Sequence, residues 1–183
     1  MIIEITREIP NTAFSVFRYL KDVMYKADGV VGRLVDHHSG LAFTDAYPDD
    51  LSKVLGPVLA IHSLNTVVED TPFFGAYDSE KTIHLPIYGF VVGKGSATSM
   101  RGNVLYRDRL SNDLVNLFKH ANGDGVFVLY EQASKQAIGH LEVIRATART
   151  IVVPAPAIEA DRFKFLVDLS LAYSTEIQDI TDS

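Results

Sequence analysis

The spacing of apolar residues predicts an amphipathic helix near the start of the chain, between Asn11 and Asp28. Apolar side chains recur there every three or four residues, as one face of a helix requires. They are Ala13, Val16, Phe17, Leu20, Met24 and Ala27. Asn11 suits the N-cap position, and Gly29 suits the residue that ends the helix.

A second helix is predicted between residues 106 and 121. Its apolar residues again follow helical spacing and end before the turn-forming pair Asn122-Gly123. They are Tyr106, Leu110, Leu114, Leu117, Phe118 and Ala121. The preceding segment, residues 93–102, is polar, and we expect it to be a flexible loop.

Five segments have the pattern of β-strands. Residues 58–61 are a short apolar run, and residues 83–92 are apolar on both faces, which favours a central strand. Residues 125–131 and 138–153 are further strand candidates. Within residues 161–173, apolar side chains occupy every second position from Phe163 to Tyr173, the pattern of a half-buried strand. The apolar positions are Phe163, Phe165, Val167, Leu169, Leu171 and Tyr173.

The remaining segments have weaker patterns. Residues 30–35 and 41–46 suggest a hairpin with a polar turn at 36–40, and residues 51–55 suggest a short helix. Residues 70–81 are loop-like but carry three aromatic rings that the domain or a partner must cover. These rings belong to Phe73, Phe74 and Tyr77.

This order of elements predicts an α+β fold. Helices and strands do not alternate regularly, so we expect a mostly antiparallel β-sheet with helices packed on one face. The length of 183 residues favours a single domain, residues 1–183. Residues 175–183 are short, polar and acidic, and we expect them to form a flexible tail.

Composition and charge narrow the classes of function. The formal net charge of -6 disfavours a tight DNA-binding protein, because such affinity depends on Lys and Arg neutralising phosphates. The chain has no cysteine, which removes disulfides, thiolate nucleophiles and the common structural zinc sites. No stretch approaches about 20 apolar residues and no signal peptide is evident, so we expect no membrane association.

The segment from Gly89 to Ser96 is the nearest approach to a phosphate-binding loop. A P-loop needs four residues between its glycines and Ser or Thr directly after the lysine. Here three residues separate Gly89 from Gly93, and Gly95 follows Lys94. The segment is therefore interpreted as an ordinary loop.

The histidines suggest at most one metal site. His37 and His38 are adjacent, so in an extended segment they point to opposite sides. The other four stand singly; they are His62, His84, His120 and His140. If the strands of His62 and His84 pair, the two side chains could meet beside a carboxylate of residues 45–50. We expect single, satisfied or solvated histidines instead.

No pattern assigns catalytic residues. No G-x-S-x-G turn precedes a helix, and the paired carboxylates fall in expected loops or turns, where solvation is the ordinary state. These pairs are Asp49-Asp50, Glu69-Asp70 and Asp78 with Glu80. The sequence therefore predicts no enzyme, cofactor or metal.

The arginines are more informative. Arg101, Arg107 and Arg109 lie at or just before the second predicted helix. Arg145 and Arg149 lie on one face of the strand predicted over residues 138–153. Because the guanidinium group pairs bidentately with carboxylates, these residues suit contacts between Arg and acidic groups of neighbouring copies.

Residues 47–174 resemble the tail terminator and tail completion proteins of long-tailed bacteriophages, which belong to the wider group of head-tail joining proteins. The resemblance is one of element order. The features that carry it are Tyr47-Pro48-Asp49, the strand Pro57–Ile61, the loop Phe73-Phe74-Gly75, the strand Leu85–Val92, the helix with Arg107, Leu110 and Leu114, the strand Gly125–Tyr130, Ile138–Leu141 leading to Arg149, and the strand Arg162–Phe165.

This resemblance implies a structural virion protein that forms a ring of its own copies, a hexamer, at the end of the tail tube. The ring would contact the tail tube protein and the neck or connector proteins, and DNA would pass through it as non-specific cargo. Assembly would take place in the host cytoplasm, and the final location would be the tail or neck of the virion. Phe73, Phe74, Arg101 and Arg107 are the expected inter-subunit contacts.

Two other functions stay open on sequence alone. An aromatic pocket formed by Phe73, Phe74, Tyr77 and Tyr88 would suit a small-molecule-binding domain or a small enzyme. An unpaired strand edge near the C-terminus would suit a peptide-binding adaptor.

Overall fold

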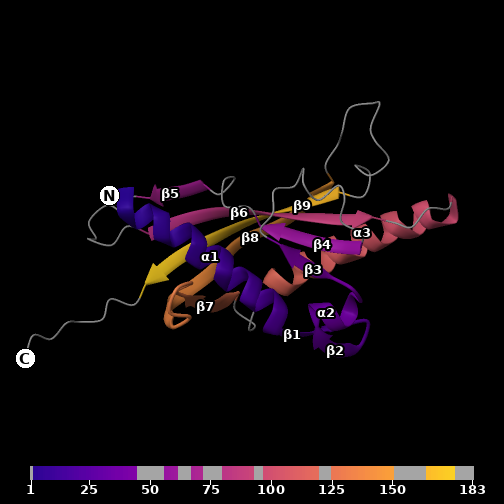
Figure 1. The fold of residues 1–183 in the computed structure, drawn as a ribbon, viewed down its shortest axis with the longest axis horizontal. Coiled ribbons are helices and arrows are strands. Elements are labelled where there is room, and N and C mark those ends of the chain that lie inside the picture. Colours follow the sequence, from indigo (N-terminus) through magenta and orange to yellow (C-terminus); the bar gives the residue numbers. More distant parts are fainter. Residues whose placement is uncertain are drawn as a thin grey trace, which may run out of the picture.

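The computed structural model describes residues 2–44, 56–61, 67–71, 80–92, 97–119, 125–150 and 164–175. Figure 1 shows the order of elements along the chain. They are α1 (Ile2–Asp22), β1 (Met24–Ala27), β2 (Val30–Arg33), α2 (Leu34–His37), β3 (Ala42–Thr44), β4 (Gly56–Ile61), β5 (Val67–Thr71), β6 (Glu80–Val92), α3 (Ala97–Lys119), β7 (Val126–Tyr130), β8 (Ala137–Thr150) and β9 (Lys164–Thr175).

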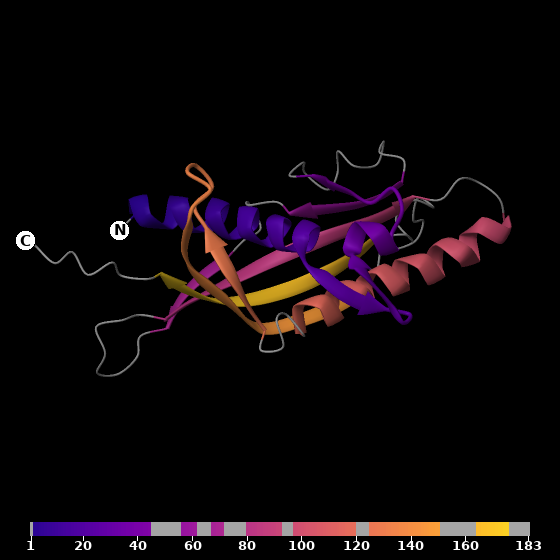
Figure 2. The same cartoon turned by 90° about the horizontal axis from the view of Figure 1, so that it is seen from below.

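The main sheet has the strand order β3-β4-β6-β9-β8-β7, and β5 also pairs with β6. Every pair is antiparallel except β3 with β4. Helices α1 and α3 lie on the same side of this sheet, in front of it in Figure 2. The expected α+β class, a mostly antiparallel sheet with helices packed on one face, is therefore confirmed.

The core lies between that face of the sheet and the helices. Its helical part includes Leu20 of α1 and Leu110 and Phe118 of α3, which are all fully buried. Alternate residues of β9 supply the sheet side, and the described ones are buried as their sequence pattern predicts. They are Phe165, Val167, Leu169 and Leu171.

The central strand β6 contains two residues that are unusual in a sheet interior. Pro86 cannot donate a backbone hydrogen bond, and it lies where pairing with β5 ends at His84 and pairing with β4 begins at Ile87. Gly89 lies opposite Phe165, whose ring occupies the space that a Cβ atom would need. Both residues therefore fit local constraints of the sheet.

The first helix differs from its prediction at both ends. It begins at Ile2, so Asn11 is not its N-cap, and it ends at Asp22 instead of Asp28. Asp28 and Gly29 have positive φ angles of 51° and 82°, and form the two-residue turn of a hairpin between β1 and β2. The helical spacing of Met24 and Ala27 was therefore misleading.

The predicted hairpin over residues 30–46 is also wrong, because its two strands pair with other strands and not with each other. Residues 30–33 pair antiparallel with the preceding strand β1, and residues 34–37 form the short helix α2. Residues 42–44 form β3, which pairs in parallel with β4. Local composition indicated the strands but could not identify their partners.

The second helix is longer than its spacing predicted. It begins at Ala97, so residues 97–102 are helical and not loop. The predicted strands at 58–61, 83–92, 125–131 and 138–153 are confirmed in their described parts, whereas residues 67–71 are the strand β5. The short helix expected at 51–55, the aromatic positions 73, 74 and 77 and the tail beyond Thr175 lie outside the described residues.

Helix α1 covers the outer edge of β7. Ser15 Oγ accepts a hydrogen bond from the backbone N–H of Tyr130 at 2.8 Å. Asn11 Oδ1 accepts one from the N–H of Gln132 at 2.9 Å. These side chains satisfy backbone donors that would otherwise be unpaired at the edge of the sheet.

Candidate functional site

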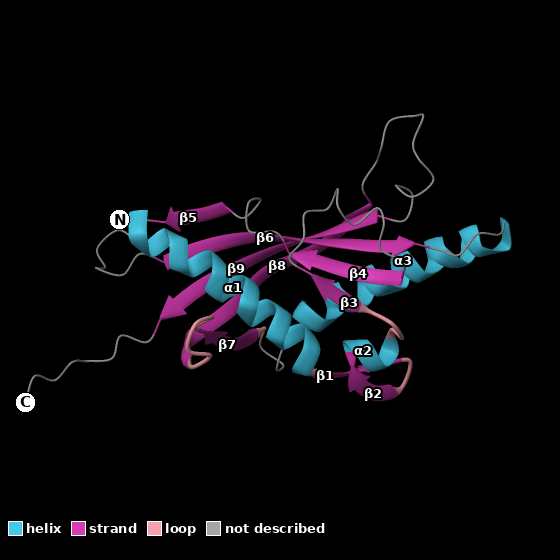
Figure 3. Ribbon diagram, in the orientation of Figure 1, coloured by secondary structure: helices cyan, strands magenta, loops and turns pink. Residues whose placement is uncertain are grey.

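A small projecting unit lies beside the main sheet, and we call residues 24–37, comprising β1, β2 and α2, the arm. Its two strands form a separate sheet, visible at the lower right of Figure 3. Met24, Val30 and Val31 are 57%, 61% and 64% exposed. The arm therefore presents apolar side chains to its surroundings, as contact surfaces do.

The arm is joined to α3 through His38, the residue that follows α2. The His38 side chain has no exposed surface. Its Nε2 lies 2.8 Å from Asp113 Oδ2, and its Nδ1 lies 3.1 Å from the hydroxyl of Tyr106. Because an ionised carboxylate only accepts hydrogen bonds, we assign the proton to Nε2, so that Nδ1 accepts from Tyr106.

Burial favours the neutral form of the His38 imidazole in this network. Burial lowers the pKa of His38, and the hydrogen bond with Asp113 opposes that shift. Burial also raises the pKa of Tyr106, so its hydroxyl stays protonated and able to donate. Carboxylate, imidazole and hydroxyl follow one another here in the order of a catalytic triad. Because His38 is fully buried and the Tyr106 hydroxyl stays protonated, the arrangement suits a structural joint instead.

An ion pair reinforces the joint, and a ring contact packs the arm against itself. Arg109 of α3 donates from Nη2 to Asp28 Oδ2 at the arm's turn, at 2.5 Å. The ring of His37 lies against that of Tyr25, with centroids 4.9 Å apart. The adjacent histidines thus serve different partners, and the arm is held to the body at several points.

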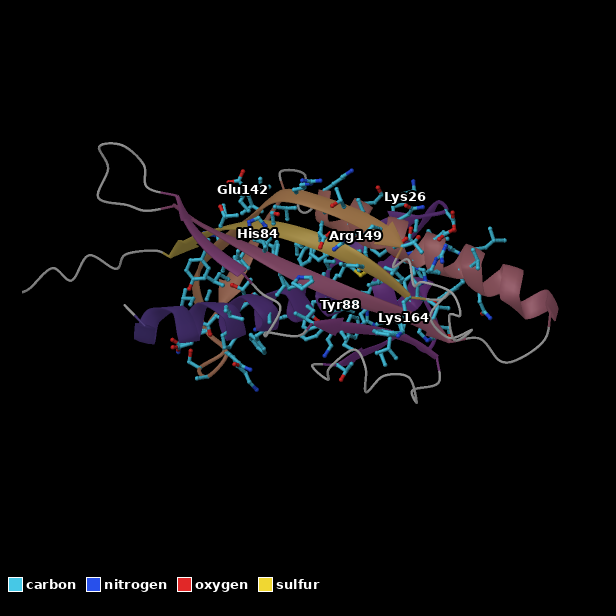
Figure 4. All side chains as sticks on the ribbon, turned by 90° about the horizontal axis from the view of Figure 1, so that it is seen from above. Lys26, His84, Tyr88, Glu142, Arg149 and Lys164 are labelled. Carbon is cyan, nitrogen blue, oxygen red and sulfur yellow. The ribbon has the colours of Figure 1, made fainter. Side chains whose placement is uncertain are left out.

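The sheet face opposite the helices carries the second candidate site. No described helix covers this face, which Figure 4 views directly. A hollow of about 410 Å³ lies over β6, β8 and β9. Its lining residues are His84, Leu85, Pro86, Tyr88, Arg145, Thr147, Arg149, Leu166, Asp168, Leu169 and Ser170.

Two polar pairs occupy part of this hollow. Arg149 Nε lies 3.0 Å from Asp168 Oδ2, and His84 Nδ1 lies 2.9 Å from Ser170 Oγ. Arg145 is exposed and forms no ion pair with any residue that the structure describes. The hollow therefore contains one guanidinium group without a counter-charge.

An irregularity in β8 brings Arg145 to this face. The register with β9 shifts between Val143 and Arg145, so Ile144 has no opposite residue. After the shift, Ala146 is buried in the core, and Arg145 and Arg149 both line the hollow. The predicted placement of the two arginines on one face is thus confirmed, because they lie four residues apart in one strand, and the bulge decides which face they share.

A larger groove, of about 530 Å³, lies between α1 and the edge strand β3. The ring of Phe17 meets that of Phe43 edge-on, with centroids 6.1 Å apart. The amino group of Lys21 lies 5.4 Å from the centre of the Phe43 ring. Among its described lining residues, the groove combines aromatic rings with polar side chains and the amino group of Lys21.

The four residues predicted from the sequence as inter-subunit contacts do not form one cluster in the described part of the chain. Phe73 and Phe74 lie outside them, and Arg101 lies in the first turns of α3. Arg107 is largely buried, and its guanidinium lies 2.7 Å from Asp108 Oδ1 of the same helix. The proposed pairing of His62 with His84 cannot be followed, because residues 62–66 are outside the described part.

The most organised polar network was missed by sequence reasoning. His38 lies 68 residues before Tyr106 and 75 before Asp113. No spacing rule links such positions, because only the packing of the arm on α3 brings them together. The helical spacing of Tyr106 and Asp113, seven residues apart on one face, was the sole local indication.

Three further findings bear on function. Within the described residues, no group of three or more His, Asp or Glu side chains could hold a metal ion. None of the described helices combines the length and apolar character needed to cross a membrane. Comparisons with family models, curated proteins and solved structures found no match.

Proposed function

We propose that this protein is a ring-forming structural subunit of a tailed bacteriophage, a tail terminator or head-tail connector that caps the tail tube and joins it to the neck. The observation that carries the proposal is the arm. An isolated two-stranded hairpin is marginally stable, yet this one is fixed to α3 by a buried network while its apolar side chains face outward. A fixed, apolar projection suits a contact with another subunit.

The arm and the sheet face that no described helix covers are different surfaces, and this difference supports a ring. When two unlike surfaces of identical subunits meet, each subunit can bind one neighbour on either side. Such head-to-tail contacts close into a ring when the rotation between subunits divides a full turn. The proposed hexamer satisfies that condition.

The charge of the chain supports the proposed channel. A net charge of -6 gives a subunit that repels phosphates on average, so DNA could pass through the ring without being held. In this proposal the tail tube protein and the neck proteins bind the two ends of the ring. The location is the tail or neck of the virion, after assembly in the host cytoplasm.

The test is the molar mass in solution by light scattering over a range of protein concentrations, with negative-stain imaging of large species. We expect rings with a central hole, and we expect Val31→Lys to weaken association at least tenfold with an unchanged circular dichroism spectrum. Gln136→Lys is the control, because it adds the same charge at an exposed turn away from the arm. A monomer at every concentration, alone and with tail or neck proteins, would contradict the proposal.

A small-molecule-binding function remains the second candidate, because Tyr88 lines the hollow beside His84 and Arg145. It predicts that an anionic metabolite raises the melting temperature of the protein. Arg145→Ala should remove that stabilisation. A metabolite screen without any shift would count against this function.

A further inference from the structure

Arg145 can donate hydrogen bonds to a carboxylate. It is exposed, lines the hollow and has no ion pair among the described residues. Arg149, 67% exposed in its side chain, pairs with Asp168 through Nε and keeps further N–H donors. A guanidinium group binds a carboxylate through two parallel hydrogen bonds, so this hollow suits an acidic peptide segment.

The chain itself contains such a segment. Residues 176–183 carry three acidic residues and no basic one, and two isoleucines lie between the acids. In order, they are Glu176, Ile177, Gln178, Asp179, Ile180, Thr181, Asp182 and Ser183. The isoleucines match the apolar wall that Pro86 and Leu166 give the hollow. Charge and apolar character are therefore both complementary.

The direction of β9 favours a neighbouring copy as the source of this segment. The part of β9 that lines the hollow ends at Ser170, and the strand continues to Thr175, which is about 17 Å further at 3.3 Å per residue. Because β9 leads away from the hollow, a segment that follows it would have to reverse direction in a turn to reach its own hollow. A neighbour's hollow imposes no such return.

We propose that residues 176–183 of one copy bind the hollow of the next copy, on the sheet face that no described helix covers, with their carboxylates paired to Arg145. This inference rests on the proposed ring, and it specifies one of its contacts. The contact is head-to-tail by construction, because the segment and the hollow are different parts of the subunit.

The first experiment mixes two variants. A chain ending at Thr175 keeps the hollow and lacks the segment. The variant Arg145→Glu keeps the segment and loses the guanidinium group that binds it. We expect each variant alone to associate at least tenfold more weakly than the intact chain, and the mixture to give hetero-complexes in light scattering. Lys135→Glu, the same charge change in an exposed turn, is the matched control and should associate normally.

The second experiment is independent of ring formation. A fluorescent peptide of residues 175–183 is titrated into the chain ending at Thr175, and its anisotropy is measured. We expect saturable binding that weakens at least tenfold with Arg145→Glu, at high salt, or when Glu176, Asp179 and Asp182 are replaced by their amides. Arg145→Lys should recover part of the affinity, because it restores the charge without the planar fork.

The outcomes separate the two proposals. Peptide binding without any ring would overturn the proposed function and leave the contact standing. Rings without peptide binding would overturn this inference alone. Peptide binding together with unchanged association of the chain ending at Thr175 would show that the segment does not join the copies, which also overturns the inference.

Discussion

At the scale of single residues, His38 shows how a polar side chain can be fully buried in this protein. Both ring nitrogens have partners, Tyr106 at Nδ1 and Asp113 at Nε2. A buried polar atom without a partner is costly, so each hydrogen bond also prevents a penalty. The network joins the arm to α3, and burial lowers the pKa of His38 and raises the pKa of Tyr106 within it.

The stability of the protein should therefore fall in mild acid. Burial lowers the pKa of His38 below its ordinary 6.5. As pH falls through 6.5, the unfolded chain takes up a proton that the folded chain does not, so the free energy of unfolding decreases. The decrease should end once pH passes below the folded-state pKa, because both states then carry the proton.

Urea denaturation between pH 5 and 8 measures this dependence. His38→Gln should flatten the slope below pH 7 and cost about 1–3 kcal/mol at pH 8, because it leaves buried partners unsatisfied. His140→Gln, which replaces a histidine on an exposed part of β8, is the matched control. A His38→Gln slope equal to that of the unchanged protein would refute the assignment.

At the scale of elements, α1 and β7 show how the protein protects a sheet edge. Unpaired backbone donors at an edge can pair with another chain, and proteins commonly cover or block them. Here Ser15 and Asn11, which are both buried, accept hydrogen bonds from the backbone N–H groups of Tyr130 and Gln132. These two polar residues of α1 therefore supply hydrogen-bond acceptors to the edge of the sheet.

Ser15→Ala tests the role of this contact. Removing Oγ leaves the Tyr130 N–H without its acceptor, so we expect a loss of about 1–3 kcal/mol in the free energy of unfolding. Hydrogen exchange at the Tyr130 amide should become faster. Ser134→Ala, which removes an exposed hydroxyl bonded to Glu131, should change stability by less than about 0.5 kcal/mol. An unchanged exchange rate at Tyr130 would show that the hydroxyl is not the acceptor in solution.

At the scale of the whole molecule, the arm and the main sheet are two units joined by polar contacts and by Leu34, which is fully buried in the main core. The arm has its own two-stranded sheet, and its ties to α3 run through His38 and the Arg109–Asp28 pair. Units joined in this way can open separately from the rest of a protein. The rigidity of the arm, and with it any assembly that uses the arm, depends on the joint.

Tyr106→Phe tests this dependence without changing the arm's outer surface. It removes only the hydroxyl that donates to His38, at a cost of about 1 kcal/mol, which corresponds to roughly a fivefold change in an equilibrium constant. We expect faster hydrogen exchange in residues 25–32, unchanged exchange in β6 and β9, and association weakened by up to that factor. Uniformly faster exchange throughout the chain would argue against a separable arm.

The sequence by itself determined the parts of the fold that depend on local periodicity. The alternation in β9 identified a strand with one buried face, and the spacing of Leu110, Leu114 and Phe118 identified α3. Such patterns are reliable because burial repeats with the geometry of the element, every two residues in a strand and every 3.6 in a helix. The α+β class followed from the order of these elements.

Only the tertiary structure decided what depends on partners far apart in the chain. The pairing of β1 with β2, the capping of β7 by Ser15 and the His38 network each join residues without a local relation. The bulge before Arg145 likewise follows from the register with β9. These contacts form because packing and hydrogen bonding are satisfied in three dimensions, and side-chain spacing along one element carries no information about the other element.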